Sequence, residues 1–162
     1  MSSSNRRRFL ALGLAGLALA GCGFSPAYGP GGVGTALRGQ IALPDPKDRD
    51  GYDFFNRLRD RLGDPSSPRF RLDYSVASEP VGAGIRPSGA ITRYTLTGRA
   101  RYALISTATG QTVTSGQVES FTSWSTSGST VATLAAEADA HRRLMVILAD
   151  QVVTRLLAAN LK

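Results

Sequence analysis

Strict alternation of polar and apolar residues in two stretches constrains the fold of this chain more than any other feature. Residues 69–76 read Arg-Phe-Arg-Leu-Asp-Tyr-Ser-Val, with the aromatic and aliphatic side chains at one parity. The alternation returns over residues 91–105. Successive side chains of a β-strand point to opposite faces, so both stretches predict strands with one buried and one solvated face.

A hairpin and a return strand are predicted to follow. Residues 107–111 form a turn in which Gly110 supplies a positive φ, and residues 113–124 form the next strand. The apolar positions of that strand change parity, which predicts an irregularity near Gly116. The segment between the two alternating stretches is predicted to be a loop, because turn-forming residues are frequent there. These residues are Pro80, Gly82, Gly84, Pro87 and Gly89.

A short strand and two helices complete the expected order. Alternation from Leu37 to Leu43 predicts the strand, which the next prolines stop. A helix is predicted from a cap at Asp50 to Gly63, and a longer one from Ser129 or Thr130 to about Leu157. The predicted buried face of the first helix comprises Tyr52, Phe55, Leu58 and Leu62. The predicted stripe of the second comprises Leu134, Ala138, His141, Met145, Leu148, Val152 and Leu156.

These elements define the expected fold class. An antiparallel meander with two helices on its apolar face is an α+β two-layer sandwich, here with a roughly four-stranded, mainly antiparallel sheet in the order β-α-β-β-β-α. Residues 37–162 are expected to form this single domain, which is long enough to bury a core. Cys22 is the only cysteine, so packing must stabilise the fold without an intramolecular disulfide.

The start of the chain has the pattern of a lipoprotein export signal. Three arginines at residues 6–8 precede an apolar run, which ends at Leu-Ala-Gly-Cys in residues 19–22. We therefore expect a signal peptide over residues 1–21, a diacylglyceryl group on the Cys22 thiol, and a Gly- and Pro-rich tether over residues 22–36. The arginines also resemble a twin-arginine motif, so the sequence leaves the twin-arginine and general export routes open.

Other interpretations of this segment fit less well. The apolar run over residues 9–20 is shorter than the roughly 20 residues that a spanning helix needs. A core helix would not be expected to begin beside three arginines and end at Gly-Cys-Gly. A lone cysteine is usually buried as a small apolar side chain, but the position of Cys22 in the pattern favours lipidation.

Motifs for catalysis or metal binding do not occur in the sequence. His141 is the only histidine, whereas a zinc site needs three or four converging ligands. There is no Gly-x-Ser-x-Gly elbow, P-loop or dinucleotide fingerprint. We therefore predict a protein that is not an enzyme and uses no metal or cofactor, and we interpret His141 as a helix-face residue with a local partner.

Arginines recur at the polar parity of the predicted strands. If the strands pair in a meander, these guanidinium groups share one exposed face, where their forked donors suit phosphate groups. Arginine on a solvated strand also blocks aggregation at sheet edges, so a binding and a purely structural role both remain open. The residues concerned are Arg69, Arg71, Arg93, Arg99 and Arg101.

The net charge of +7 narrows the choice of partner. Nucleic acid is a poor partner for an exported lipoprotein, and part of the charge would leave with the signal peptide. A phosphorylated glycolipid or an acidic protein surface fits a moderately basic envelope protein better. The charge also aids solubility without any partner, and composition does not separate these roles.

Residues 22–29, Cys-Gly-Phe-Ser-Pro-Ala-Tyr-Gly, carry a resemblance to a known family. A lipobox followed by Gly-Phe-x-Pro-x-Tyr is similar to the start of the LPS-assembly lipoproteins of the LptE family. Residues 136–140 and 148–151, followed by Arg155-Leu156, resemble the C-terminal helix of that family. The order of the predicted elements also agrees over the whole mature chain.

This resemblance implies a function in the outer membrane. Members of the family are lipid-anchored on its periplasmic side, plug the lumen of an LptD-type β-barrel, help it assemble, and bind lipopolysaccharide on its way to the cell surface. The arginine face would then meet phosphates of the glycolipid. The alternative is an auxiliary lipoprotein of another envelope transporter or complex, which binds protein but no glycolipid.

Overall fold

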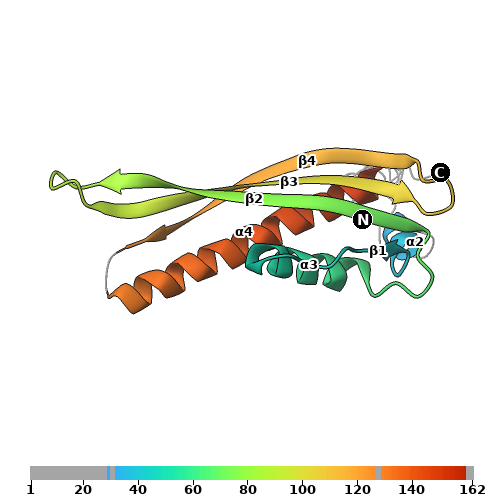
Figure 1. Ribbon diagram of the computed structural model, residues 1–162, viewed down its shortest axis with the longest axis horizontal. Coiled ribbons are helices and arrows are strands. Elements are labelled where there is room, and N and C mark those ends of the chain that lie inside the picture. The colour runs from blue at the N-terminus through green and yellow to red at the C-terminus, as the bar shows by residue number, and fades with distance from the viewer. Residues whose placement is uncertain (1–28, 30–31, 127–128, 160–162) are drawn as a thin grey trace, which may run out of the picture.

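The computed structural model describes residues 29, 32–126 and 129–159, and Figure 1 shows a sheet lying on a layer of helices. The predicted signal peptide and Cys22 lie outside these residues. The elements are α2 (Val33–Leu37), β1 (Ile41–Ala42), α3 (Arg49–Leu62), β2 (Phe70–Ile85), β3 (Ile91–Ser106), β4 (Thr112–Ser125) and α4 (Thr130–Ala158). The α+β sandwich predicted from the sequence is confirmed. Its sheet is mixed, because β1 is parallel to β2 and the other pairs are antiparallel.

The inner face of the sheet packs on the helices and forms the core. Leu72, Leu96 and Leu104 project from β2 and β3 and are fully buried, which stabilises the fold by about 1.5–3 kcal/mol for each side chain. At Gly98 a Cβ atom would lie 2.7 Å from the Cδ2 atom of Leu144. The missing side chain therefore lets α4 approach β3 closely.

Strand β2 is longer than the sequence predicted. It continues through Pro80, Gly82 and Gly84 to Ile85, so only residues 86–90 form the expected loop. Beyond Arg71 this strand pairs with β3 alone, and a proline is tolerated where its ring nitrogen faces a free edge. The glycines coincide with register shifts, which lie between residues 82 and 85.

The buried face of α3 is rotated from the predicted one. Its core residues are Phe54, Leu58 and Leu62, whereas Tyr52 is 56% exposed and Phe55 is only half-buried. Spacings of four residues place these three side chains in one row. Asp48 rather than Asp50 caps the helix, by accepting a hydrogen bond from a backbone N–H, and the predicted stop at Gly63 is confirmed.

Three other local predictions are wrong. Residues expected to begin a strand at Leu37 instead end the short helix α2, and the strand comprises only Ile41 and Ala42. The irregularity in β4 lies between Thr112 and Thr114, while Gly116 pairs in register with Tyr102. In α4, Leu134 is exposed because the first turns of the helix lie at the end of the molecule opposite α2 (Figure 1).

The prediction for α4 is confirmed at the cap and along the second half of the stripe, whereas Ala138 and His141 are only half-buried. Ser129 caps the helix, and Met145, Leu148, Val152 and Leu156 are fully buried. None of the described helices is both long and apolar enough to cross a membrane.

Candidate ligand-binding sheet face

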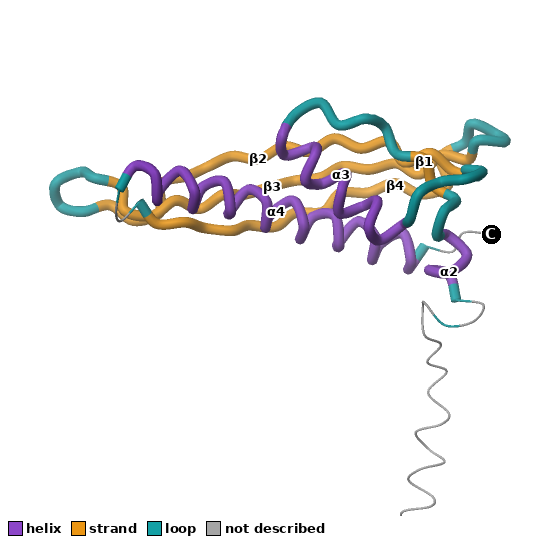
Figure 2. Tube along the Cα trace, turned by 90° about the horizontal axis from the view of Figure 1, so that it is seen from below, coloured by secondary structure: helices purple, strands orange, loops and turns teal. Residues whose placement is uncertain are grey.

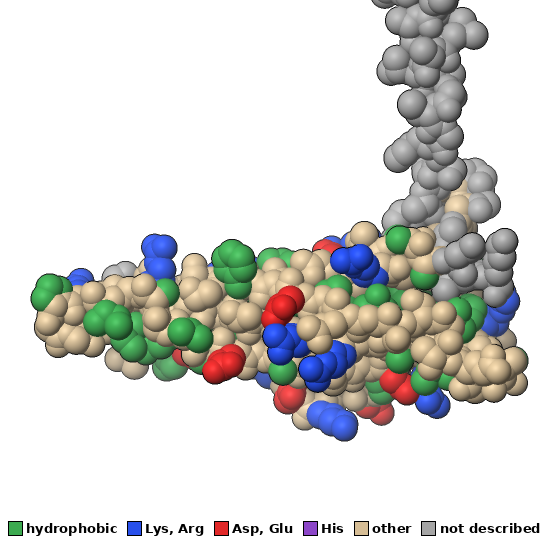
Figure 3. All heavy atoms as spheres, turned by 90° about the horizontal axis from the view of Figure 1, so that it is seen from above, with side chains coloured by type: hydrophobic (Ala, Val, Ile, Leu, Met, Phe, Trp, Pro, Cys, Tyr) green, Lys and Arg blue, Asp and Glu red, His purple; other side chains and the backbone are tan. Residues whose placement is uncertain are grey.

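The outer face of the sheet carries the arginines that the sequence singled out. In the antiparallel register, Ser75, Arg101 and Gln117 lie opposite one another on β2, β3 and β4. The next row contains Ala77, Arg99 and Glu119. Figure 3 shows this face, with Lys and Arg side chains gathered beside acidic ones over the middle of the sheet. The register therefore brings Arg99 and Arg101 together on one solvated surface.

The two neighbouring arginines have different partners. Arg99 forms an ion pair with Glu119, with 2.5 Å between Nη2 and Oε1. Arg101 donates from Nε to the neutral side-chain oxygen of Gln117 over 3.0 Å. The amide orients the guanidinium but does not neutralise it. Arg101 is therefore the arginine of this pair whose full positive charge remains available to an anionic ligand.

Arg71 lies on the same face but is already engaged. Its Nε and Nη2 atoms donate to both carboxylate oxygens of Asp73, at 2.9 and 3.1 Å. The hydrogen bonds with Asp73 raise the pKa of Arg71, which is charged at any physiological pH in any case. Arg71 pairs with Ile105 and Arg101 with Ser75, so four strand positions, about 13 Å, separate the two arginines.

The remaining two arginines are not brought into this group. Arg69 precedes β2, and its guanidinium lies 5.6 Å from the centre of the Phe70 ring. Arg93 pairs with Ser125 at the distal part of β3, six residues or about 20 Å along the strand from Arg99. A single phosphate cannot contact all five predicted residues. The strand parity was sound, but the sequence did not provide the register that separates them.

Hydroxyl groups lie on the same face as the central arginines, some beside them and some farther along β3. Thr97 and Thr95 share the outer parity on β3, two and four positions from Arg99, and Ser75 lies opposite Arg101. A shallow depression of about 300 Å³ lies beside Arg99 and is bounded by Thr97 and Glu79, among others. The surface offers hydrogen-bond donors around an exposed positive charge, which suits an anionic, hydroxylated ligand.

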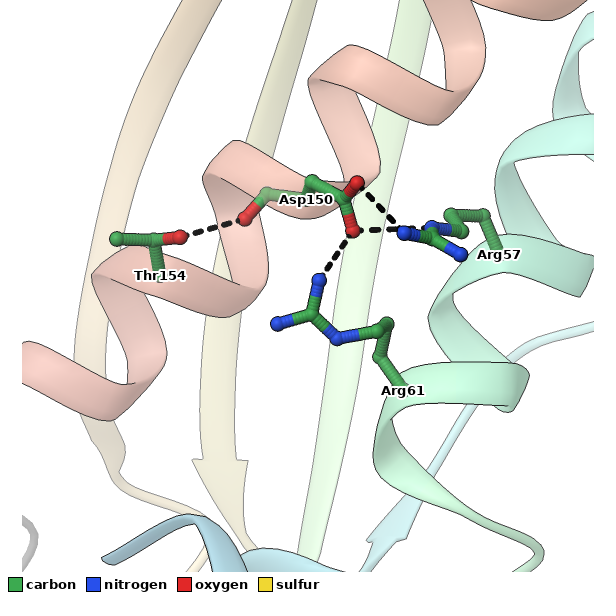
Figure 4. Close-up of polar contacts among 4 residues, drawn as sticks. All are labelled: Arg57, Arg61, Asp150 and Thr154. Carbon is green, nitrogen blue, oxygen red and sulfur yellow. Dashed lines mark hydrogen bonds and ion pairs between the residues drawn. The ribbon is translucent and has the colours of Figure 1, made fainter. Parts of the chain in front are cut away.

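A second polar cluster lies within the helix layer and joins α3 to α4 (Figure 4). Arg57 contacts both carboxylate oxygens of Asp150, at 3.0 and 2.8 Å, and Arg61 contacts one of them at 2.6 Å. The hydrogen bond with Asp150 raises the pKa of Arg57 despite some desolvation. The Thr154 hydroxyl donates to the Asp150 carbonyl oxygen at 2.8 Å. The cluster tethers the two helices and was not predicted from the sequence.

His141 has the local partner that the sequence analysis expected. Its Nδ1 lies 3.0 Å from both carboxylate oxygens of Asp50, and the Ser78 hydroxyl donates to Asp50 at 2.8 Å. The serine contacts the aspartate rather than the histidine, so this is not the arrangement of a catalytic triad. Among the described residues, no group of three or more His, Cys, Asp and Glu side chains is placed to hold a metal ion.

Together these features define a two-layer α+β domain that presents a polar, arginine-bearing sheet face. A family model described as "LptE: Lipopolysaccharide-assembly" matches residues 39–156. The chain belongs to this lipopolysaccharide-assembly family, and membership supports a role in that process. The comparison with curated proteins found no match.

Solved structures of lipoproteins share the fold. A putative lipoprotein from Caulobacter crescentus superposes with a TM-score of 0.64 and 23% identity, over 80% of this chain and 96% of its own. Rare lipoprotein B from Shewanella oneidensis gives 0.57 and 13%, over 74% and 92% of the two chains. A minor lipoprotein from Acinetobacter baumannii gives 0.54 and 16%, over 73% and 88%. At these identities the likeness concerns the fold.

Proposed function

We propose that this protein is an outer-membrane lipoprotein of lipopolysaccharide export that acts with an LptD-type β-barrel. The family match over residues 39–156 carries the proposal. The predicted lipidation of Cys22 supports it, because a lipid on that residue anchors the domain to a membrane. The domain then helps the barrel to assemble and delivers lipopolysaccharide to the cell surface, without catalysing a reaction.

Within this function, the outer sheet face binds lipopolysaccharide. Arg101 is the central contact, since its charge is not neutralised by Gln117. Arg99 contributes when a phosphate competes with Glu119, its exposed partner. The hydroxyls on the same face contact sugar groups. Arg71, Arg69 and Arg93 lie farther away and contribute to the general positive potential around the face.

Purification from the native membrane tests the partnership. The lipidated protein should co-purify with a large outer-membrane β-barrel, and its depletion should stop lipopolysaccharide from reaching the surface. Cys22→Ala should abolish membrane attachment while leaving the fold intact. If the protein is isolated from its membrane without any barrel and its depletion leaves surface lipopolysaccharide unchanged, the proposed function is wrong.

Substitutions that add negative charge test the binding face. Gln117→Glu places a carboxylate where Arg101 now meets a neutral amide. It should weaken lipopolysaccharide binding about tenfold or more, because a charge-assisted hydrogen bond contributes about 1.5–3 kcal/mol. Arg101→Glu should weaken it further. The matched control is Arg49→Glu, an exposed charge reversal on α3. Equal affinities in all three variants would exclude this face from binding.

One observation favours the alternative, an auxiliary lipoprotein that binds only protein. Two of the five predicted arginines, Arg71 and Arg99, are already paired with carboxylates. Such a mixed-charge surface also fits a polar protein wall. Pull-down with lipopolysaccharide separates the two functions. Only lipopolysaccharide export requires that immobilised lipopolysaccharide retain the protein and that Gln117→Glu reduce this retention.

A further inference from the structure

The two edges of the sheet differ in how they are protected. On β2, the Thr107 N–H donates to the Arg69 carbonyl oxygen at 3.0 Å, so odd-numbered residues bond to β3 and even-numbered ones face the free edge. Pro80 is one of these outward residues and has no N–H to offer. Proline is a common device against pairing of an exposed edge with another chain.

The β4 edge has no such device. The Thr126 N–H donates to the Thr92 carbonyl oxygen at 3.0 Å, so even-numbered residues of β4 bond to β3 and odd-numbered ones direct their backbone groups outward. The outward residues are Ser115, Gln117, Glu119, Phe121 and Ser123. None is Pro, Lys or Arg, and the one charge, on Glu119, is paired with Arg99.

One outward backbone group of the β4 edge is already bonded by a side chain of α4. Arg143 of α4 donates from Nη2 to the Ser123 carbonyl oxygen at 3.4 Å, which agrees with the outward direction of that group. Within the described part of the chain, the structure records no hydrogen bond for the outward backbone groups from Ser115 to Phe121. Four alternate residues therefore present an open ladder.

A groove runs beneath the open ladder. Figure 2 shows that the C-terminal half of α4 extends past β4, and a groove of about 740 Å³ lies between them. Ile147, 37% exposed, and Arg155 contribute to its α4 side. The neighbouring Asp150 is held by Arg57 and Arg61, and no ion pair of Arg155 occurs among the described residues. The α4 side of this groove, here called its floor, thus combines an apolar surface with a positive charge.

We propose that the β4 edge from Ser115 to Phe121 receives an extended strand of another protein, which becomes the fifth strand of the sheet. Backbone hydrogen bonds to the four outward residues supply affinity, and alternate side chains of the guest point into the groove. The chemistry of the floor selects an apolar side chain over Ile147 and a carboxylate beside Arg155. This inference goes beyond the proposed function and does not require it.

A synthetic peptide tests the edge directly. The probe is a ten-residue peptide of alternating threonine and valine, with glutamate at both terminal valine positions so that either strand direction reaches Arg155. Added to the full-length protein in detergent, it should slow amide exchange of Ser115, Gln117, Glu119 and Phe121 at least tenfold. A peptide with two central prolines should have no effect. Unchanged exchange with the threonine–valine peptide overturns the proposal.

Two variants locate the binding. Ser115→Pro removes an outward N–H that the β3 ladder does not use, and should weaken peptide binding at least tenfold, while Ser115→Ala should bind normally. Ile147→Glu alters only the exposed floor and should also weaken binding, with thermal unfolding confirming that both variants fold. Equal peptide affinity in Ser115→Pro, Ile147→Glu and the native chain overturns the proposal.

Two further measurements separate other outcomes. Light scattering that detects a dimer dissolved by Ser115→Pro would assign the edge to a second copy and overturn the proposal of a foreign strand. Lipopolysaccharide binding should not change in Ser115→Pro, because Arg101 lies one strand inward on the outer face. Failure of the edge proposal is thereby distinguishable from failure of the proposed function.

Discussion

Two of the arginine–carboxylate contacts in the molecule, one between the helices and one on the sheet, differ in exposure. Between α3 and α4, the side chains of Arg57, Arg61 and Asp150 are about one third exposed or less, and one carboxylate serves two guanidinium groups (Figure 4). On the outer sheet face, Arg99 and Glu119 are each about half exposed and pair one to one.

This difference in exposure separates structural from functional chemistry. A partly buried pair is screened weakly, so removing one partner leaves a poorly solvated charge. An exposed pair contributes about 0–1 kcal/mol and is easily exchanged for another ligand. The helix-layer cluster is therefore expected to fix the packing of α3 on α4, and the sheet-face pair to tune the charge that a ligand meets.

The largest effect is expected in the helix layer. Asp150→Asn should lower the free energy of unfolding by about 2 kcal/mol, because both arginines lose their carboxylate in a partly buried position. Chemical denaturation measures the loss. Glu119→Gln is the matched control on the sheet face and should cost less than about 1 kcal/mol. Equal losses in the two variants would contradict the distinction between the regions.

A charge swap on the sheet face sharpens the comparison with a smaller effect. Arg99→Glu faces Glu119 with a like charge and should cost about 0.5–1 kcal/mol. Adding Glu119→Arg restores an opposite pair and should recover most of that stability. Lipopolysaccharide affinity measured in parallel shows whether net charge or the position of Arg99 matters. A double variant that remains as unstable as Arg99→Glu would show that the pair contributes through its geometry.

Exposure to water also explains which parts of the fold could be predicted from the sequence. Alternation reports which side chains meet water, so the strands around residues 69–76 and 91–105 were predicted correctly. The helix stop at Gly63 was also correct, and of the two candidate caps, Ser129 and Thr130, the structure has Ser129. Proline and glycine in β2 were misinterpreted as a loop. Their effect depends on whether a neighbouring strand needs the N–H, which only the sheet topology determines.

The candidate site was predictable only in part. Parity placed Arg99 and Arg101 on the solvated face, but their partners Glu119 and Gln117 follow from the β3–β4 register. The cluster around Asp150 joins residues roughly 90 positions apart, and no local pattern announces such a contact. Distances between the predicted arginines likewise depend on register, which is why five candidates reduce to one adjacent pair.

The smallest expected effect concerns the exposed pairs of α4, where pairing alters a titration more than the fold. Asp139 accepts from Arg143 Nε at 2.7 Å and also contacts Arg142, and the hydrogen bond from Arg143 is the main reason that the pKa of Asp139 lies below its usual 3.8. A carboxyl whose folded pKa is lowered stabilises the fold above its unfolded pKa, and this contribution disappears as the pH falls through the folded value.

NMR titration should therefore place the midpoint of the Asp139 titration below 3.8, and Arg143→Gln should move this pKa back upward. Arg155→Gln, farther along the same helix, is the control and should leave the titration unchanged. If Asp139 in the native chain titrates at 3.8 or above, exposed pairing in this molecule is too transient to hold a charge, and the sheet-face pair of Arg99 and Glu119 would be expected to yield to a phosphate just as readily.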